Sequence, residues 1–321
     1  MAKQRPIEQT LKELSNLSGM GAAVASELQK HLASKINLVA AKAADLIREA
    51  DLKSLQPQLC EGFFRFMKDA GTTDKGCGAK QAIANALYEM GCDAHEVFLA
   101  GIHHIQKEAA WGKPVDTAAE MRGICALGLV RMAYRDVMSE LVSLLVDESH
   151  QARIMAARAI AYSGRDEGAL LFRLKILTGD VVEDVTGECL LALANLSRGR
   201  AISFIAKYLD SPSPTIAEAA ALALGEMRDE GALTVLIERW LGEVLGEVRK
   251  SFALPISLSR LPRSLEFLLN VVASEAEPVA AAAVEALVIY RHVDTARVRI
   301  ESAVASRNSV DLRAQYEKLF V

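Results

Sequence analysis

The sequence has few of the residues that build disulfide frameworks or metal sites. Its 321 residues include five cysteines and six histidines, and the cysteines are dispersed without a C-x-x-C pair. An odd, scattered set of cysteines is typical of buried thiols in a reducing compartment and not of disulfides or structural zinc. We therefore expect no disulfide, no metal site and no cofactor.

Long apolar runs are also missing. Lys42 and Glu285 interrupt the most apolar stretches before either stretch reaches the length needed to cross a bilayer. The first residues include Lys3 and Arg5 but no apolar segment of the kind that forms a secretory leader. We expect a cytoplasmic protein that is neither exported nor inserted into a membrane.

No long run of like charge is present. The chain has 37 Lys plus Arg against 41 Asp plus Glu, which gives a formal net charge of -4. Binding to duplex nucleic acid normally requires a clustered basic surface that releases counterions. Nucleic acid is therefore a disfavoured partner.

Catalytic motifs are absent as well. No G-x-S-x-G or H-E-x-x-H segment occurs. Residues 76–80 contain two glycines and Lys80, but they lack the spacing of a phosphate-binding loop. Asp74 stands just before them and is placed to cap a helix that starts there. The sequence thus predicts no catalytic residue.

What the sequence does contain is a repeat. The six residues 165–170, Arg-Asp-Glu-Gly-Ala-Leu, recur letter for letter at 228–233, sixty-three positions later. A related helix-to-turn segment, residues 191–198, stands 31 positions before residues 222–229. The period is therefore about 31 residues. Such a period indicates an array of helical pairs in which each pair buries its apolar face against its neighbours.

Each repeat has a first helix, a tight turn, an alanine-rich second helix and a short polar turn. Ser213 is placed to cap a helix, and Pro214 and Pro262 have the fixed φ suited to a first helical position. Gly168 and Gly231 are predicted to supply the permissive backbone between one helix and the next.

Residues 218–233 resemble the short HEAT-like repeat, which is also called the phycobilisome-lyase-type repeat, and residues 151–170 fit equally well. The N-terminal third fits only in outline. The resemblance implies an all-α fold, a right-handed α-solenoid (superhelix) of about eight helical hairpins of roughly 31 residues, with a concave inner surface. Scaffolds, regulators and a few enzymes use this fold, so the resemblance names no single activity.

We expect one elongated domain over residues 1–321, because a repeat array of this length can be continuous. Amphipathic helices within Pro6–Met20 and Val310–Phe320 are predicted to cover its two ends. The predicted parts are N-terminal capping helices at 1–50, divergent repeats at 51–134 with an insert at 105–122, regular repeats at 135–308, and a C-terminal capping helix at 309–321.

The repeat rhythm fails between Met90 and Tyr134. Both are predicted to end second helices, yet they stand 44 positions apart. The added residues fall within the insert at 105–122. Insertions in a solenoid map to loops on one face, and loops carry function more often than packed repeats do.

The insert has two interpretations. Trp111 can be an exposed anchor for a partner, with Arg122 or nearby acids recognising polar groups. Alternatively, Trp111 folds back over the gap between two repeats, Asp116 or Thr117 caps the next helix, and Glu120 completes a capping box.

The leading hypothesis is a non-enzymatic scaffold or adaptor that binds a protein partner through the concave surface, with the insert as a specificity element. The alternatives are an enzyme or accessory factor of the bilin-lyase type and a nucleic-acid-binding HEAT-like protein. The sequence leaves the oligomeric state open. The candidate partner-binding residues are His103, His104, Trp111, Asp116, Glu120, Arg122, Arg131 and Arg158.

Overall fold

A computed structural model describes residues 4–18 and 24–320 of the chain. The chain divides into two compact units, Met1–Ser163 (unit 1) and Gly164–Val321 (unit 2). Each unit is a stack of paired helices, which confirms the predicted all-α solenoid class. The single domain over 1–321 stays a prediction.

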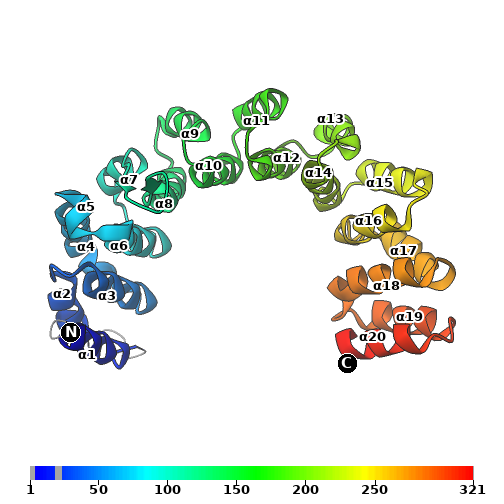
Figure 1. The fold of residues 1–321 in the computed structure, drawn as a ribbon, viewed down its shortest axis with the longest axis horizontal. Helices are drawn as coiled ribbons and strands as arrows, with labels where there is room; N and C mark the ends of the chain where they lie inside the picture. The colour runs from blue at the N-terminus through cyan, green and yellow to red at the C-terminus, as the bar shows by residue number, and fades with distance from the viewer. Residues whose placement is uncertain (1–3, 19–23, 321) are drawn as a thin grey trace. The chain divides into compact units, whose positions relative to one another are not determined.

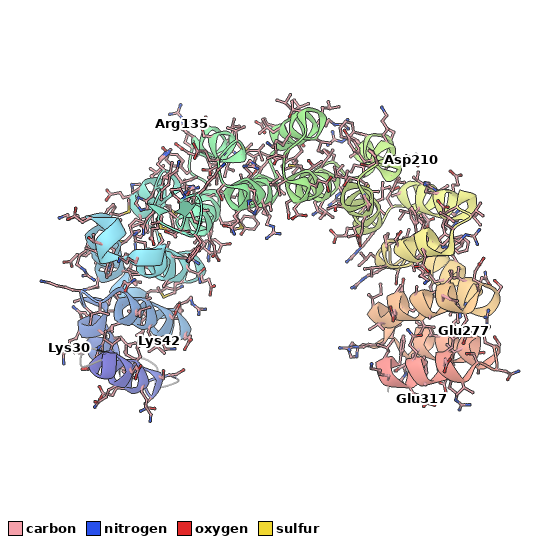
Figure 2. All side chains as sticks on the ribbon, viewed as in Figure 1. Lys30, Lys42, Arg135, Asp210, Glu277 and Glu317 are labelled. Carbon is pink, nitrogen blue, oxygen red and sulfur yellow. The ribbon has the colours of Figure 1, made fainter. Side chains whose placement is uncertain are left out.

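In unit 1 the second helices of the pairs form one row, and the first helices form a parallel row that packs along one side of it (Figure 1). The row runs α3, α6, α8, α10, and its partners are α2, α4, α7 and α9. Lys30 on α2 and Lys42 on α3 mark the two sides (Figure 2). The elements are α1 Gln4–Ser15, α2 Ala25–Leu32, α3 Asn37–Glu49, η2 Lys53–Leu55, α4 Gln56–Met67, α5 Ala70–Thr73, η3 Lys75–Cys77, α6 Gly78–Glu89, α7 His95–Ile102, β1 Lys107–Glu108, β2 Val115–Asp116, α8 Ala119–Arg131, α9 Val137–Leu145 and α10 His150–Ser163.

Unit 2 repeats this arrangement. Its second helices α12, α14, α16, α18 and α20 each contact the next, and the first helices of the pairs lie beside them. The elements are α11 Glu167–Thr178, α12 Glu183–Ser197, η4 Arg198–Ala201, α13 Ile202–Ile205, η5 Ala206–Asp210, α14 Pro214–Glu226, α15 Glu230–Gly242, α16 Gly246–Leu258, α17 Pro262–Ser274, α18 Glu277–Ala286, η6 Leu287–Tyr290, α19 Asp294–Ala305 and α20 Val310–Phe320.

Small residues allow the second helices to approach closely. In α14, Ala220, Ala223 and Leu224 are fully buried. A Cβ added to Gly225 would lie 2.2 Å from the backbone oxygen of Pro255 in α16, so only glycine fits there. Burial of a leucine such as Leu224 contributes about 1.5–3 kcal/mol to folding. The core of each unit therefore lies along its row of second helices.

The predicted helix starts are confirmed in unit 2. The Ser213 hydroxyl accepts a hydrogen bond from the amide of Ile216 at 3.3 Å, and Pro214 is the first residue of α14. Pro262 likewise opens α17.

The role predicted for Gly168 and Gly231 is wrong. Both residues lie in the first turns of α11 and α15, and neither has a positive φ. The left-handed residues come earlier, because the turn is made at the C-terminal end of each second helix. Gly164 with φ 65° and Arg228 with φ 52° are two of these residues.

Helices α1 and α20 are the first and last helices of the described residues, and their capping role stays a prediction. Helix α1 packs on α3, although residues 19–23 lie outside the described part, as does Lys3. Helix α20 packs on α18 and α19. Its buried residues are Leu312, Tyr316 and Phe320.

One described stretch, Glu183–Asp210, is long and apolar enough by composition to cross a membrane. Its first part is α12, which ends at Ser197 and packs against α11 and α14. A helix at the centre of a packed array has the same composition, so this stretch is explained by its place in the core.

Candidate functional site

Unit 1 departs from the repeat length twice. Left-handed residues mark the ends of its second helices at Asp51, Gly91, Ala133 and Gly164. The last two are 31 residues apart, whereas the two earlier intervals are each about 40 residues long. The longer interval before Ala133 contains the predicted insert. The interval before Gly91 contains the irregular residues 68–77, which the sequence analysis did not identify.

The two irregular segments contact each other. The amide of Gly76 donates to Glu108 Oε1 at 2.7 Å, and Gln106 Nε2 donates to the backbone oxygen of Asp74 at 2.8 Å. Two departures from the repeat, more than 30 residues apart in sequence, therefore form one structural feature of unit 1.

The insert forms a β-hairpin between α7 and α8. Strand β1 pairs antiparallel with β2, with Lys107 opposite Asp116 and Glu108 opposite Val115. The connecting residues 109–114 include Gly112, whose φ of 103° suits glycine. We call residues 107–116 the hairpin.

A buried ion pair lies beneath the hairpin. Lys80 Nζ lies 3.0 Å from Asp74 Oδ2, and both side chains are fully buried. Lys80 also donates to Gln106 Oε1 at 2.8 Å. Asp74 accepts from the amides of Ala79 and Lys80 in the first turn of α6, as its predicted capping position implies. A buried charge with this many partners holds its surroundings in one arrangement.

A second charged group fixes the base of the hairpin. Arg122 is 1% exposed, and its NH1 and NH2 atoms lie 2.7 Å from Asp116 Oδ2 and 2.8 Å from Asp147 Oδ1. Arg122 NH1 also donates to the backbone oxygen of His104 at 3.0 Å. Because Arg122 is enclosed by carboxylates, it is not available to a partner. The predicted contact role of Arg122 is therefore wrong, and we assign it a positioning role.

The pKa values of this region reflect the same contacts. Burial raises the pKa of Asp116, but the amides of Gln106 and Ala118 and the guanidinium of Arg122 outweigh burial and hold it below its usual value. Burial lowers the pKa of His104, which hydrogen-bonds Gln106 at 3.2 Å. The region is therefore organised around a charged Asp116 and a neutral His104 at neutral pH.

The tip of the hairpin carries Trp111 into solvent. Its side chain is 107% exposed, so it does not cover a gap between repeats. Ile105 and Val115 are also exposed. The predicted capping box does not form, because the residue that precedes α8 is Ala118. Asp116 Oδ1 nevertheless accepts a hydrogen bond from the amide of Ala118 at 3.1 Å, just before the helix begins. Of the two interpretations, the exposed position of Trp111 favours the anchor.

The remaining candidate residues are dispersed. His103 is exposed and pairs with Glu140 at 2.9 Å, at the edge of a pocket of about 140 Å³. Arg131 lies over the ring of Tyr88 at the end of α8, while Glu120 and Arg158 are exposed on α8 and α10. Among the candidates, Arg122 contacts both His104 and Asp116.

Four residues that shape the site were missed as its components. They are Asp74, Lys80, Gln106 and Asp147, and each acts by holding the hairpin. A partial sequence signal is Lys80, which precedes the apolar positions Ile83 and Leu87 of α6.

The thiols of the chain are not activated. Burial raises the pKa of Cys77 to about 12, and it also raises the pKa of Cys60, Cys92 and Cys125. A reactive cysteine needs a lowered pKa. Across residues 4–18 and 24–320, no three His, Cys, Asp or Glu side chains come together as metal ligands.

A family model described as HEAT repeats matches residues 170–257. Among solved structures, the chain is similar to the complex of CpcE and CpcF of phycocyanin lyase from Nostoc sp. PCC7120, with 16% identity and a TM-score of 0.41 over 77% of this chain and 94% of that one. It is also similar to an engineered protein, with 18% identity and a TM-score of 0.39 over 97% of this chain and 93% of that one.

No curated protein matches the chain in sequence. At the identities and TM-scores given above, similarity to a solved structure assigns neither an activity nor a partner. The assignment rests on the matched segment, on the alanine-rich second helices and on the paired packing within each unit. Residues 170–257 of this chain are HEAT-like repeats.

Proposed function

We propose that this protein is a non-enzymatic scaffold or adaptor that binds a protein partner through the face formed by its second helices, and that the hairpin determines which partner binds. We also propose that it acts in the cytoplasm, where its five free cysteines would stay reduced. The observation that carries the proposal is the exposure of Trp111 on a firmly anchored hairpin.

An exposed tryptophan suits a protein interface. Trp111 has its whole side chain in solvent, and exposed Val115 lies in the adjacent strand. Tryptophan is among the residues most enriched at the energetic centre of protein interfaces, because one side chain buries a large area with few rotatable bonds. A partner with an apolar pocket would bury Trp111.

The anchoring of the hairpin supports the same proposal. Asp116 at the end of the hairpin is held by Arg122, and Glu108 at its start accepts from Gln106, Gly76 and Thr117. A segment that is ordered before binding loses less conformational entropy when it binds. The buried network therefore improves the affinity that one aromatic anchor can provide.

The two tryptophans of the chain provide a matched test of stability. Trp240 is 3% exposed and packs edge-on against Phe267, with ring centroids 5.1 Å apart. Trp240→Ala should reduce the free energy of unfolding by about 3–5 kcal/mol. Trp111→Ala should change it by less than about 0.5 kcal/mol. Equal losses in the two variants would show that Trp111 serves packing and would contradict the proposal.

The binding test uses a photo-crosslinking amino acid at position 111 of the full chain in native lysate. Position 181 is the control, because Val181 is 96% exposed and lies in unit 2. We expect a protein that crosslinks at 111 and not at 181, and whose capture by the unlabelled protein is lost in Trp111→Ala but kept in Val181→Ala. Capture that is equal in both variants would exclude the hairpin as the specificity element.

A further inference from the structure

Three successive second helices of unit 2 are followed within two residues by an arginine. Arg198 follows α12, Arg228 follows α14 and Arg260 follows α16. The three residues, which we call the arginine row, line one pocket of about 560 Å³. Asn195, Glu226, Met227 and Leu258 also line this pocket. The repeat thus brings three cations from three pairs of helices to one place.

The arginine row is set apart by its lack of partners. Within the described residues of unit 2, every other arginine has a hydrogen bond, an ion pair or a ring contact, as Arg239 has with Asp210 at 3.1 Å. The side chains of Arg198, Arg228 and Arg260 have no such contact, and all three are exposed. The N–H donors of their guanidinium groups therefore make no hydrogen bond within the described residues of unit 2 and are free to bind a ligand.

The backbone at these positions makes arginine an unexpected choice. Arg198, Arg228 and Arg260 have φ values of 45°, 52° and 52°, in the left-handed region that favours glycine. The equivalent positions in unit 1 are Asp51, Gly91, Ala133 and Gly164, of which two are glycine and none is arginine. A turn alone would be formed more easily by glycine. A cation near a helix C-terminus interacts favourably with the helix dipole, but that interaction does not use the guanidinium donors.

We propose that this pocket binds an acidic segment of a partner protein, with one carboxylate for each arginine. Neighbouring packed helices lie about 8–10 Å apart, so successive arginines of the row follow a similar spacing. An extended peptide advances about 3.3 Å per residue, and every third side chain is therefore about 10 Å from the last. Arginine binds carboxylates through two parallel hydrogen bonds, which adds specificity to charge attraction.

The other residues of the pocket favour a peptide over a free phosphate or a nucleic acid. Glu226 lines the pocket with the arginines and can accept from a peptide N–H, a donor that the phosphodiester backbone of a nucleic acid lacks. Asn195 can donate to and accept from a peptide backbone, while Met227 and Leu258 offer apolar contact. The proposal rests on unit 2 alone, so it can hold or fail separately from the role of the hairpin.

The test measures binding of a fluorescent peptide to the full chain by anisotropy. The peptide has about nine residues with glutamate at every third position in a Gly/Ser background, a spacing of about 10 Å, and a second peptide has glutamine instead. The row variant is the triple substitution Arg198→Gly/Arg228→Gly/Arg260→Gly. It removes the three charges, and glycine adopts the positive φ of these positions without strain. The matched control is Arg263→Gln/Arg299→Gln/Arg313→Gln, which removes three exposed arginines that already have acidic partners.

We expect the glutamate peptide to bind the unsubstituted protein, and the row variant to bind it at least about tenfold more weakly, because each charged hydrogen bond contributes that order of affinity. The control variant should bind within about twofold of the unsubstituted protein, since surface pairs are nearly neutral in energy. Binding should weaken as salt rises.

Four outcomes would overturn the proposal. The glutamate peptide does not bind, or the glutamine peptide binds equally well, or the control variant loses as much affinity as the row variant. The fourth outcome is that inorganic phosphate displaces the fluorescent peptide at the concentration at which unlabelled glutamate peptide displaces it. A short single-stranded oligonucleotide that binds more tightly than the glutamate peptide, and loses binding in the row variant, would assign the pocket to nucleic acid instead.

Discussion

Arg122 lies in the first turn of the second helix α8 in unit 1, and Arg228 lies just after the second helix α14 in unit 2, yet their surroundings are opposite. Arg122 is buried and held by Asp116 and Asp147. Arg228 is exposed, has no partner and lines a pocket. In unit 1 Arg122 fixes the shape of an insert, while in unit 2 the arginine row has no partner among the described residues of the unit. Charge in a repeat array thus has two separate uses, which substitution can distinguish.

The largest effect is expected from the buried lysine. Lys80→Met leaves Asp74 charged and buried without its partner, so the free energy of unfolding should fall by about 3–5 kcal/mol. Lys107→Met is the matched control, because the Lys107–Glu148 pair is exposed and screened by solvent, so its loss should change the free energy of unfolding little. Urea unfolding followed by circular dichroism measures both. Similar losses in the two variants would contradict the distinction between buried and exposed charge.

Arg122→Gln should have a somewhat smaller effect, of about 2–4 kcal/mol, because glutamine can keep one hydrogen bond to Asp116 or Asp147. Arg228→Gln should change the free energy of unfolding by less than about 0.5 kcal/mol. This pair of variants tests whether the buried arginine supports the fold and the exposed arginine does not. A loss in Arg228→Gln that approaches the loss in Arg122→Gln would mean that the arginine row supports the fold.

The free energy of unfolding of unit 1 should also fall as the pH is lowered. The pKa of His104 is lower in the folded protein than the ordinary value of about 6.5, because burial disfavours the charged ring. The unfolded chain therefore takes up this proton first, and stability falls as the pH drops from that value toward the lower folded pKa. The pKa of Asp116 is also lowered, so its contribution is lost later, as the pH falls through its folded value.

Unfolding curves at a series of pH values measure this effect. His104→Gln should remove the first part of the acid loss and keep the second. An unchanged profile in His104→Gln would mean that other groups cause the loss near neutral pH.

The smallest effect is expected from Arg228→Gly. Glycine adopts the φ of 52° without strain, so the variant should be as stable as the unsubstituted protein or more stable by up to about 1 kcal/mol. Thermal unfolding measures this difference. A clear loss of stability would show that the arginine side chain stabilises the helix end, which would weaken the argument that the row is kept for a ligand.

The repeats could be predicted from the sequence because their signals are local. Ser213 and Pro214 mark a helix start through contacts within one turn, and the alanine-rich helices follow from a period of about 31 residues. The position of the insert was predicted for the same reason, since an interrupted period is visible without knowing which residues touch.

The environment of the insert could not be predicted in this way. Gln106 contacts Lys80 and Asp74, which lie 26 and 32 residues earlier in the chain. Nothing in the local pattern shows whether Arg122 points into solvent or between two carboxylates. The arginine row had a faint signal, because Leu-Ser-Arg occurs at both 196–198 and 258–260, but pattern alone does not show that the side chains lack partners.

The buried network has a consequence for how freely this array could be rearranged. Repeats in a solenoid normally contact only their neighbours, so whole repeats can be added or removed. In unit 1, hydrogen bonds and ion pairs run from Asn37 through Asp74, Gln106 and Arg122 to Asp147, from the start of α3 to the turn after α9. Removing any one helical pair in this span would leave buried charge exposed or unpaired. We therefore expect that single helical pairs between Asn37 and Asp147 cannot be deleted or exchanged separately without destabilising unit 1.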